Sequence, residues 1–256
     1  MAEEPLTLTI LGSGTSSGVP VIGCDCSVCA SHDSRNRRLR CSALLAWGEY
    51  RVLIDTATDL KAQALTHELK RVDAVLYTHC HADHVNGIDD LRCFNALSGK
   101  DIPIYGASWV LEQLKHNFSY VFREQTRGFR PQLRSVEVSG AFKLFGREIV
   151  PVVLHHGHDK VIGYRIGRMA YLTDCSEIPV AAREQLCDLD LLVIDGLRFR
   201  HHPTHFTVDE AVEMARLLQA KRVVLTHLSH DVDYERDSLQ LPEHVEFAYD
   251  GLSVTL

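Results

Sequence analysis

The sequence predicts a sheet-rich α/β sandwich built as one domain over residues 1–256. With 256 residues, 45% of them hydrophobic and 24% charged, the chain can form one large apolar core. Short apolar runs rich in β-branched and aromatic residues come in groups, and helical patterns lie between some of them. This order favours a sheet-rich sandwich over a strictly alternating doubly wound fold.

The expected strands are short apolar runs bounded by polar or turn-forming residues. The run that ends before the first histidine cluster, Ala74 to Tyr77, is the one that bears most directly on function. The expected strands cover residues 6–11, 42–47, 51–54, 74–77, 102–105, 136–138, 149–154, 163–166, 169–173, 191–194, 222–226 and 245–249.

The expected helices show apolar residues at spacings of three and four. They cover residues 59–69, 109–116, 179–186 and 207–218. Thr207 is a candidate N-cap, and Glu210 three positions later completes a capping box. No repeat, low-complexity linker or shift in composition divides the chain.

Composition narrows the class of protein. The start MAEEPLTLTI has two glutamates and no basic region followed by a long apolar core, and no later segment approaches 18 uninterrupted apolar residues. We therefore expect a cytoplasmic protein with no membrane partner. The formal net charge of −7 argues against broad, sequence-independent binding to nucleic acid, and fifteen histidines are a first indication of metal chemistry.

The stretch THCHADH, directly after an expected strand, crowds metal-binding side chains into one turn. His79 and His81 are two residues apart, so on a continuing strand they point the same way and can bind one ion together. Asp83 and His84 lie past the turn and can approach a second ion. Imidazole and carboxylate ligands suit zinc, iron or manganese, and two neighbouring ions can clamp the attacking and leaving oxygens of a displacement.

A second cluster has the pattern C-x-C-x-x-C, formed by Cys24, Cys26 and Cys29. In a reducing compartment such clustering favours zinc over disulfides, although disulfides and plain buried thiols are the alternatives. A closed zinc site needs a fourth ligand, and His230 is the candidate. We expect a zinc loop at about residues 23–30, and no chemical role for the five scattered cysteines.

Two segments rich in arginine are candidate ligand contacts. The segment at about residues 117–135 interleaves aromatic residues with Arg123, Arg127 and Arg130, a composition suited to a lid over an anionic substrate; the alternative is a solvated loop. The run RNRRLR, residues 35–40, is interpreted as a solvated face more readily than as a nucleic-acid patch. The glycines of LGSGTSSGVP lack the lysine of a Walker loop, so we expect tight turns there.

The pattern H-x-H-x-D-H, formed here by His79, His81, Asp83 and His84, resembles the ligand motif of the metallo-β-lactamase superfamily. The resemblance implies that family's four-layer αβ/βα sandwich and three further ligands. These are His156, chosen over His155 and His158 because it precedes glycine, Asp174 in AYLTDCS, and His227 in RVVLTH. It further implies one ion on His79, His81 and His156, a second on Asp83, His84 and His227, and Asp174 bridging both.

The run GSGTSSGVPVIGCDCSVC together with the late H-x-S-H looks like one branch of that superfamily, which contains the cyclic-phosphate phosphodiesterase of bacterial phosphonate (carbon–phosphorus lyase) metabolism. This resemblance implies that the Cys₃His zinc is structural and that the substrate is a small cyclic or nucleotide phosphodiester. A hydroxide shared by two zinc or manganese ions would attack phosphorus. It also implies that His205 is a general acid or phosphate contact, and we count Asp83 among the catalytic residues.

Two other activities remain open within the same fold. The tRNA 3′-processing endoribonucleases have a similar LGSGTS-like start, so RNA is the second candidate substrate, although their long basic arm has no obvious counterpart here. Thioester or lactam hydrolysis is the third candidate. For assembly, a homodimer is the default expectation.

Overall fold

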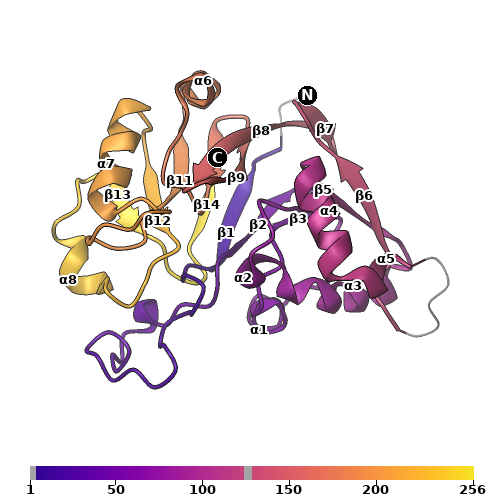
Figure 1. Ribbon diagram of the computed structural model, residues 1–256, viewed down its shortest axis with the longest axis horizontal. Coiled ribbons are helices and arrows are strands. Elements are labelled where there is room, and N and C mark those ends of the chain that lie inside the picture. The colour runs from indigo at the N-terminus through magenta and orange to yellow at the C-terminus, as the bar shows by residue number, and fades with distance from the viewer. Residues whose placement is uncertain (1–3, 124–128) are drawn as a thin grey trace. The chain divides into compact units, whose positions relative to one another are not determined.

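The computed structural model describes residues 4–123 and 129–256, and the chain divides into two compact units. Unit 1 consists of residues 1–12, 41–139 and 251–256, and unit 2 of residues 13–40 and 140–250. Each unit contains one sheet with helices packed against it (Figure 1). Neither unit is a continuous half of the sequence, because the chain passes from one to the other four times.

The sheet of unit 1 has the strand order β14-β1-β2-β3-β4-β5-β6. Neighbours from β14 to β3 are antiparallel, whereas β3, β4, β5 and β6 are parallel, so their carboxyl ends share one edge. These strands are β1 (Thr7–Gly12), β2 (Ser42–Trp47), β3 (Tyr50–Ile54), β4 (Ala74–Leu76), β5 (Ile102–Gly106), β6 (Leu133–Glu137) and β14 (Ser253–Thr255).

The helices of unit 1 connect its parallel strands. The helix α4 packs on β5 and β6, and it buries Val110, Leu111 and Leu114, which lie on one face at helical spacing. The helices are α1 (Leu60–Thr66), α2 (Ala82–Val85), the 3₁₀ turn η2 (Asn86–Asp90), α3 (Leu91–Ser98), α4 (Ser108–Asn117) and α5 (Ser119–Phe122).

The sheet of unit 2 has the order β13-β12-β11-β10-β9-β8-β7. The strands β10 to β13 are parallel, and β8 has the same direction because it and β10 both pair antiparallel with β9. The carboxyl ends of β8, β10, β11 and β12 therefore share one edge. The strands are β7 (Phe142–Leu144), β8 (Arg147–His156), β9 (Asp159–Ile166), β10 (Met169–Leu172), β11 (Leu191–Asp195), β12 (Val223–Thr226) and β13 (Val245–Phe247).

The longest helix of unit 2 is α7, which packs on β11 and β12 and begins with the predicted capping box. Glu210 N donates to Thr207 Oγ1 at 3.2 Å, and Thr207 N donates to Glu210 Oε2 at 2.8 Å. The helices are η1 (Ser34–Asn36), α6 (Val180–Arg183), η3 (Glu184–Leu186), α7 (Val208–Leu217) and α8 (Tyr234–Ser238).

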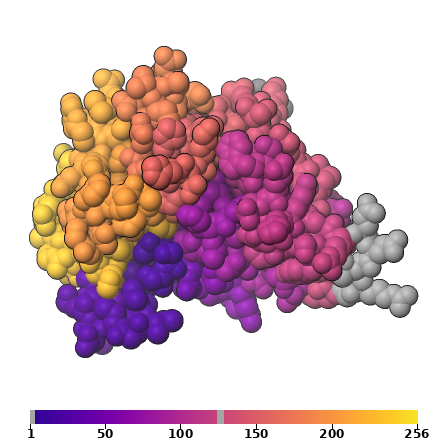
Figure 2. All heavy atoms as spheres, viewed as in Figure 1, coloured from indigo at the N-terminus to yellow at the C-terminus, as the bar shows by residue number. Residues whose placement is uncertain are grey.

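Residues 13–40 form an irregular segment of unit 2. Gly14 bridges to Arg40 and to Leu228, and Val19 bridges to Arg38. A Cβ at Gly14 would lie 2.9 Å from Arg38 Cβ and from Arg38 O, so only glycine fits this close approach. Figure 2 shows the segment in indigo against orange and yellow residues of the same unit. Tight turns at these glycines were the sequence expectation. Gly18 fits it, with a φ of 62° and its N donating to Thr15 O at 2.8 Å, whereas Gly12 lies in β1 and Gly14 in extended bridges.

Several expected elements differ from the structure. The expected helix 179–186 is one turn of α-helix followed by a 3₁₀ turn, and the strand expected at 136–138 is β6, which begins at Leu133. The helix α3 and the short edge strands β7 and β14 were not expected. Across residues 4–123 and 129–256, no helix is both long and apolar enough to cross a membrane.

Candidate metal-dependent active site

The histidine motif lies at the carboxyl edge of the sheet in unit 1. The ring centroids of His79 and His81 are 4.6 Å apart, and those of His79 and His84 are 4.3 Å apart. His84 N donates to His81 O at 3.0 Å, which closes the turn into α2, and His84 Nε2 lies 3.3 Å from an Asp83 carboxylate oxygen. The structure thus brings together three imidazoles and one carboxylate, of which His81 is exposed and the others are buried.

Asp55, which follows β3, orients this motif and was not foreseen from the sequence. Its Oδ2 accepts hydrogen bonds from His84 Nδ1 at 2.7 Å and Thr78 Oγ1 at 2.7 Å, and its Oδ1 accepts from Thr78 N at 2.8 Å. Burial raises the pKa of Asp55, and the bond to His84 opposes that rise. Because Asp55 holds the proton on Nδ1 of His84, the lone pair of Nε2 is available to an ion.

The corresponding edge of unit 2 carries His156, Asp174 and His227. His227 Nε2 lies 3.3 Å from an Asp174 carboxylate oxygen. His156 Nδ1 donates to Thr204 O at 2.7 Å, which leaves its Nε2 as the acceptor nitrogen. Candidate ligand atoms of His156, Asp174 and His205 lie within 4.8 Å of one another.

The two alternatives to His156 lie elsewhere. His155 points to the other face of β8, where it meets Glu177 Oε2 at 3.1 Å, and His158 is exposed on the turn after β8. Among the three candidate histidines, His156 is therefore the one placed beside Asp174.

His205 is paired with a buried acid at the end of β11. Asp195 Oδ2 accepts from His205 Nδ1 at 2.6 Å and from Cys175 N at 3.0 Å. The His205 ring stacks on the His227 ring with centroids 4.8 Å apart and lies 4.6 Å from the His156 ring. Sequence reasoning missed Asp195; its signal was an acid at the end of an apolar run, directly before glycine in LLVIDG.

His202 lies in the loop before His205. It is half-buried, with its ring 5.0 Å from that of His205. Burial, then the neighbouring His205 and Arg198, lower the pKa of His202. It is therefore a neutral imidazole near neutral pH, with Nδ1 3.2 Å from Thr204 Oγ1.

Three residues at these sheet edges have a left-handed backbone, as do four other non-glycine residues in the described part of the chain. Asp55, Asp174 and His227 have φ values of 61°, 52° and 58°, in the left-handed region that non-glycine residues seldom adopt. Each such position costs on the order of 1–3 kcal/mol and persists where surrounding contacts impose it. The imidazoles and carboxylates at these edges form donor sets that fit divalent zinc, manganese or iron.

The cysteine cluster fits a tetrahedral zinc site within unit 2. The Sγ atoms of Cys24, Cys26 and Cys29 lie 3.3, 3.5 and 3.6 Å from His230 Nδ1. Zn–S bonds of about 2.3 Å and Zn–N bonds of about 2.0–2.1 Å at tetrahedral angles give an S–N separation of roughly 3.5 Å. The four residues predicted from sequence therefore lie together at the spacing that zinc requires.

The thiols of this cluster differ in acidity. The Cys29 amide, which donates to Cys26 Sγ at 3.4 Å, lowers the pKa of Cys26 to about 6. Burial instead raises the pKa of Cys29 to about 11. Three neighbouring thiolates repel one another, and a bound cation stabilises the deprotonated form of all three.

The structure describes two of the three arginines expected to contact substrate, Arg123 and Arg130. Arg127 is outside the described residues, and Arg123 donates to Ser119 Oγ at 3.4 Å. Arg130 precedes β6, at the amino edge of the sheet, whereas His79 follows the carboxyl end of β4. Arg130 lines a surface pocket of about 300 Å³ there with Arg92 and Phe129. This placement argues against a contact between Arg130 and a substrate held at His79.

The α/β sheets and the imidazole and carboxylate side chains at their carboxyl edges define a metal-dependent hydrolase of the αβ/βα sandwich class. A family model described as a beta-lactamase superfamily domain matches residues 50–228. The chain belongs to the metallo-β-lactamase superfamily, and it has a site for divalent metal ions.

Individual relatives agree with this assignment. A crystal structure described as a new diphosphatase from the PhnP family is 44% identical with a TM-score of 0.94, covering 100% of this chain and 98% of that one. The zinc-bound PqqB of Methylobacterium extorquens is 19% identical with a TM-score of 0.81, covering 98% and 100%, and it shares the fold.

One curated relative is much longer than this chain. An octanoyltransferase of Porphyromonas gingivalis is 38% identical over 96% of this chain but 51% of its own length, so the chain spans about half of that relative. A ribonuclease Z of Myxococcus xanthus is 29% identical over 72% of this chain and 81% of its own length.

Proposed function

We propose that the chain is a metal-dependent phosphodiesterase that hydrolyses a small cyclic or nucleotide phosphodiester. The observation that carries this proposal is the pair His205 and Asp195, next to His156 and Asp174 at one sheet edge. Asp195 fixes the proton on Nδ1 of His205, so Nε2 is the nitrogen that can exchange a proton with a leaving oxygen.

The chemistry divides between ions and side chains. Divalent ions bound by imidazoles and carboxylates supply an activated water and neutralise charge on phosphate oxygens. The imidazolium form of His205, which Asp195 stabilises, protonates the leaving oxygen. The neutral imidazole that remains takes up another proton before the next turnover. His202, a neutral donor against His205, contacts a phosphate oxygen.

We infer that the ligands are those expected from the sequence, with zinc or manganese as the catalytic ions and Asp83 among the catalytic residues. They are His79, His81, Asp83, His84, His156, Asp174 and His227. The hydrogen bonds from His84 to Asp55 and from His156 to Thr204 support this set, because ligand histidines ordinarily donate their other ring nitrogen to an oxygen.

The relatives support a phosphorus centre in the substrate. The structure at 44% identity is described as a diphosphatase, and ribonuclease Z proteins cleave RNA as their name states. We therefore propose that the enzyme cleaves phosphoric ester bonds, and that cleavage of phosphoric anhydride bonds is the nearest alternative activity.

A substrate panel on one metal-loaded sample tests this proposal. It contains bis-p-nitrophenyl phosphate, a 2′,3′-cyclic nucleotide, a ribosyl cyclic phosphate, a dinucleotide diphosphate, pre-tRNA and an octanoyl thioester. The highest kcat/KM should belong to a small phosphodiester. Preference for pre-tRNA would establish the endoribonuclease alternative instead, and turnover of the thioester alone would refute phosphoryl chemistry.

Ligand variants test the active-site assignment. His79→Ala and Asp174→Ala should abolish turnover of bis-p-nitrophenyl phosphate and retain the circular-dichroism spectrum. His158→Ala, at an exposed histidine, is the matched control and should behave as wild type. Full activity in either ligand variant would remove that residue from the set.

We also propose that Cys24, Cys26, Cys29 and His230 hold a structural zinc. Because such zinc contributes folding free energy directly, Cys26→Ser should lower the melting temperature, whereas Cys187→Ser, at an exposed cysteine, should not. Metal analysis should find about three transition-metal ions per chain in the wild type.

The octanoyltransferase relative supports thioester hydrolysis as a second candidate function. Its name belongs to a protein about twice as long, so the acyl-transfer activity can reside in the part that this chain does not match. The octanoyl thioester in the panel separates the two candidates. For location and assembly we propose a cytoplasmic homodimer, the former supported by clustered free thiols.

A further inference from the structure

Arg38 belongs to the basic run at 35–40, and its position contradicts the solvated face favoured by the sequence. The residue is only 2% exposed, and its guanidinium lies inside unit 2. Nη1 donates to Ser229 O at 2.8 Å, and Nη2 donates to Val232 O at 2.9 Å. These two carbonyls flank His230, the histidine of the Cys₃His cluster.

The backbone of the same residue is bonded to the cysteine side of the cluster. Arg38 N donates to Val19 O, and Val19 N donates to Arg38 O, both at 2.8 Å. Val19 packs against Val28 and Cys29 in a small apolar cluster. Arg38 therefore links the segment that carries the three thiols to the turn that carries the histidine.

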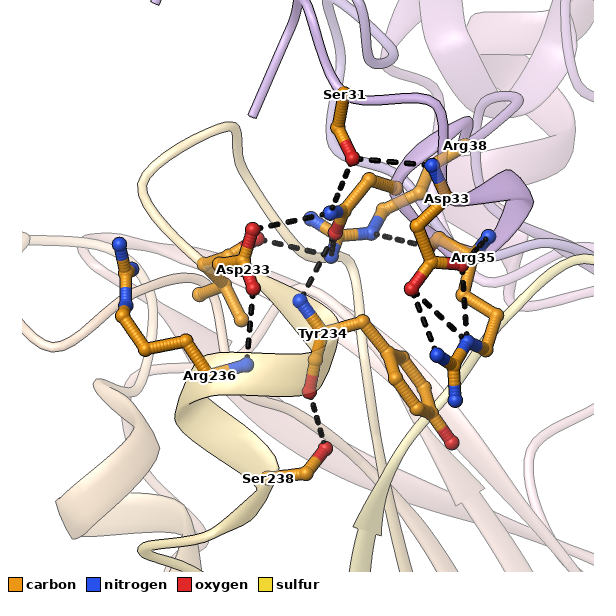
Figure 3. Close-up of polar contacts among 10 residues, drawn as sticks. Ser31, Asp33, Arg35, Arg38, Asp233, Tyr234, Arg236 and Ser238 are labelled. Atoms are coloured by element: carbon orange, nitrogen blue, oxygen red, sulfur yellow. Dashed lines mark hydrogen bonds and ion pairs between the residues drawn. The ribbon is translucent and has the colours of Figure 1, made fainter. Parts of the chain in front are cut away.

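Asn36 forms a second link beside Arg38. Its Oδ1 accepts from Arg38 Nη2 at 2.9 Å and from Tyr234 N at 2.9 Å, and its Nδ2 donates to Asp233 Oδ2 at 3.1 Å. Figure 3 shows Arg38 lying between the chain near Ser31 and the chain at Asp233 and Tyr234. The turn at 227–234 is thus held by donors and acceptors other than the four side chains of the cysteine cluster.

The charge of Arg38 persists despite its burial. Burial lowers the pKa of its guanidinium to about 10, and the nearby Asp250, Asp233 and Asp237 oppose that shift. At neutral pH the group is charged, and charge-assisted bonds to carbonyls are among the stronger hydrogen bonds in proteins. A neutral side chain of similar length would fill the space but remove one donor from Val232 O and leave Ser229 O with only the longer bond from Val232 N at 3.3 Å.

The same turn begins with His227. Leu228 N donates to Ser13 O at 2.8 Å, and Thr15 N donates to Leu228 O at 3.1 Å, so the backbone beside His227 is also fixed to the segment 13–40. His227 itself has a φ of 58°. A strained ligand keeps its conformation only while the residues after it are held.

We propose that Arg38 is a positioning residue that holds the turn at 227–234. By holding this turn it places His230 for zinc and His227 beside Asp174. The inference concerns how the site is held: Arg38 fixes the turn through bonds that involve none of the four side chains of the cysteine cluster. It rests on the proposed function only in taking zinc as the ion of the cysteine cluster.

The test compares Arg38→Met with Arg37→Met, a substitution at the exposed neighbouring arginine. Release of zinc to a chromogenic chelator should be at least tenfold faster in Arg38→Met and unchanged in Arg37→Met. After cobalt substitution, the thiolate-to-cobalt absorption band should lose intensity in Arg38→Met alone. On the best phosphodiester, kcat should fall while KM stays near the wild-type value.

Two further variants separate positioning from general stability. Leu192, in β11, belongs to the apolar core of unit 2. Leu192→Ala removes apolar contacts from that core and should lower the melting temperature without changing the cobalt spectrum. Arg38→Lys retains a charged donor but not the fork, and it should give intermediate zinc release. If Arg38→Met does not fold, Arg38→Lys and Asn36→Ala carry the same measurements, with release faster than in wild type expected for both.

Wild-type zinc release and a wild-type cobalt spectrum in folded Arg38→Met, or in both substitute variants, would overturn the inference. A wild-type chain that binds no zinc at its cysteines would overturn it as well. Failure of the phosphodiesterase proposal is distinguishable, because it would appear as inactivity on every phosphodiester while zinc release and the cobalt spectrum still reported the role of Arg38.

Discussion

Buried acids orient the histidines at both sheet edges. Asp55 holds His84, and Asp195 holds His205, each through Nδ1 at 2.7 and 2.6 Å respectively. In each pair the acid determines which ring nitrogen faces the reaction, so the chemistry of the histidine depends on a residue that need not touch substrate.

The proposed role of His205 as a general acid predicts a dependence on the leaving group. His205→Ala should lower kcat/KM about 10²–10⁴-fold for a phosphodiester with an alkoxide leaving group, because that oxygen requires a proton. The loss should be far smaller for bis-p-nitrophenyl phosphate, whose phenolate leaves unprotonated.

His201→Ala, at an exposed neighbour in the same loop, serves as the control for this comparison. Equal losses on both substrates would show that His205 holds phosphate or an ion instead of donating a proton.

Asp55→Asn should weaken binding of divalent ions by about 10–100-fold, because an amide cannot fix the proton on Nδ1 of His84 as a carboxylate does. Calorimetric titration of metal-free protein measures this change. Asp101→Asn, at an exposed acid before β5, should titrate as wild type. Unchanged affinity in Asp55→Asn would mean that Thr78 alone orients the motif.

Sequence reasoning finds such residues only when their signal is local. The first histidine motif lies within six positions, and its residue types indicate metal binding: His79, His81, Asp83 and His84. Asp55 is separated from His84 by 29 positions, and Asp195 from His205 by 10, so each reads as a single acid after an apolar run. Their partners become visible only when the strands are paired.

At the scale of elements, the strands that lead to the proposed site were predicted better than the helices between them. β4, β10, β11 and β12 are buried along their whole length, and continuous apolar runs reveal such strands. The helix α7 was also predicted, because its capping box and its apolar spacing agree. The helix α3 was missed because its buried residues are Leu91, Phe94 and Asn95, and one of these three is polar.

The cap of α7 gives a prediction for stability. Thr207→Ala should lower the free energy of unfolding by about 1 kcal/mol, because Glu210 N loses its acceptor at the start of the helix. Urea denaturation measures the change, and Thr207→Ser, which keeps the hydroxyl, should restore most of it. A Thr207→Ala protein as stable as wild type would show that Glu210 alone caps the helix.

At the scale of the whole molecule, charged side chains lie inside the fold as well as on its surface. The chain has a net charge of −7, yet within unit 2 Arg38 is buried and Asp250 is half-buried. Uniform composition hid the division of the chain into two units, because each unit mixes segments from distant parts of the sequence. Sequence alone therefore predicted the class of fold but not this partition.

Asp250 predicts a specific dependence of stability on pH. Burial raises the pKa of this carboxyl from 3.8 to about 6, and hydrogen bonds from Leu39 N and Ser13 oppose the rise. A raised pKa of an acid stabilises the fold fully below about pH 4, and that contribution is lost as pH rises through about 6.

The measurement is the difference in free energy of unfolding between wild type and Asp250→Asn from pH 4 to 7. Wild type should lose stability relative to the variant over that interval and reach a plateau above pH 6. Because both proteins share every other titrating group, a difference independent of pH would show that Asp250 does not titrate there.

The pairing of β1 with β14 has a consequence for protein synthesis. β14 follows every other strand in the sequence, yet it forms the edge of the sheet beside β1, with Leu8 opposite Val254 and mutual backbone bonds between Leu6 and Leu256. On the ribosome, β1 emerges early, and its edge on this side stays open until β14 has been released. During that interval the nascent chain carries an unpaired β-edge, which is a surface that strands of other chains can pair with.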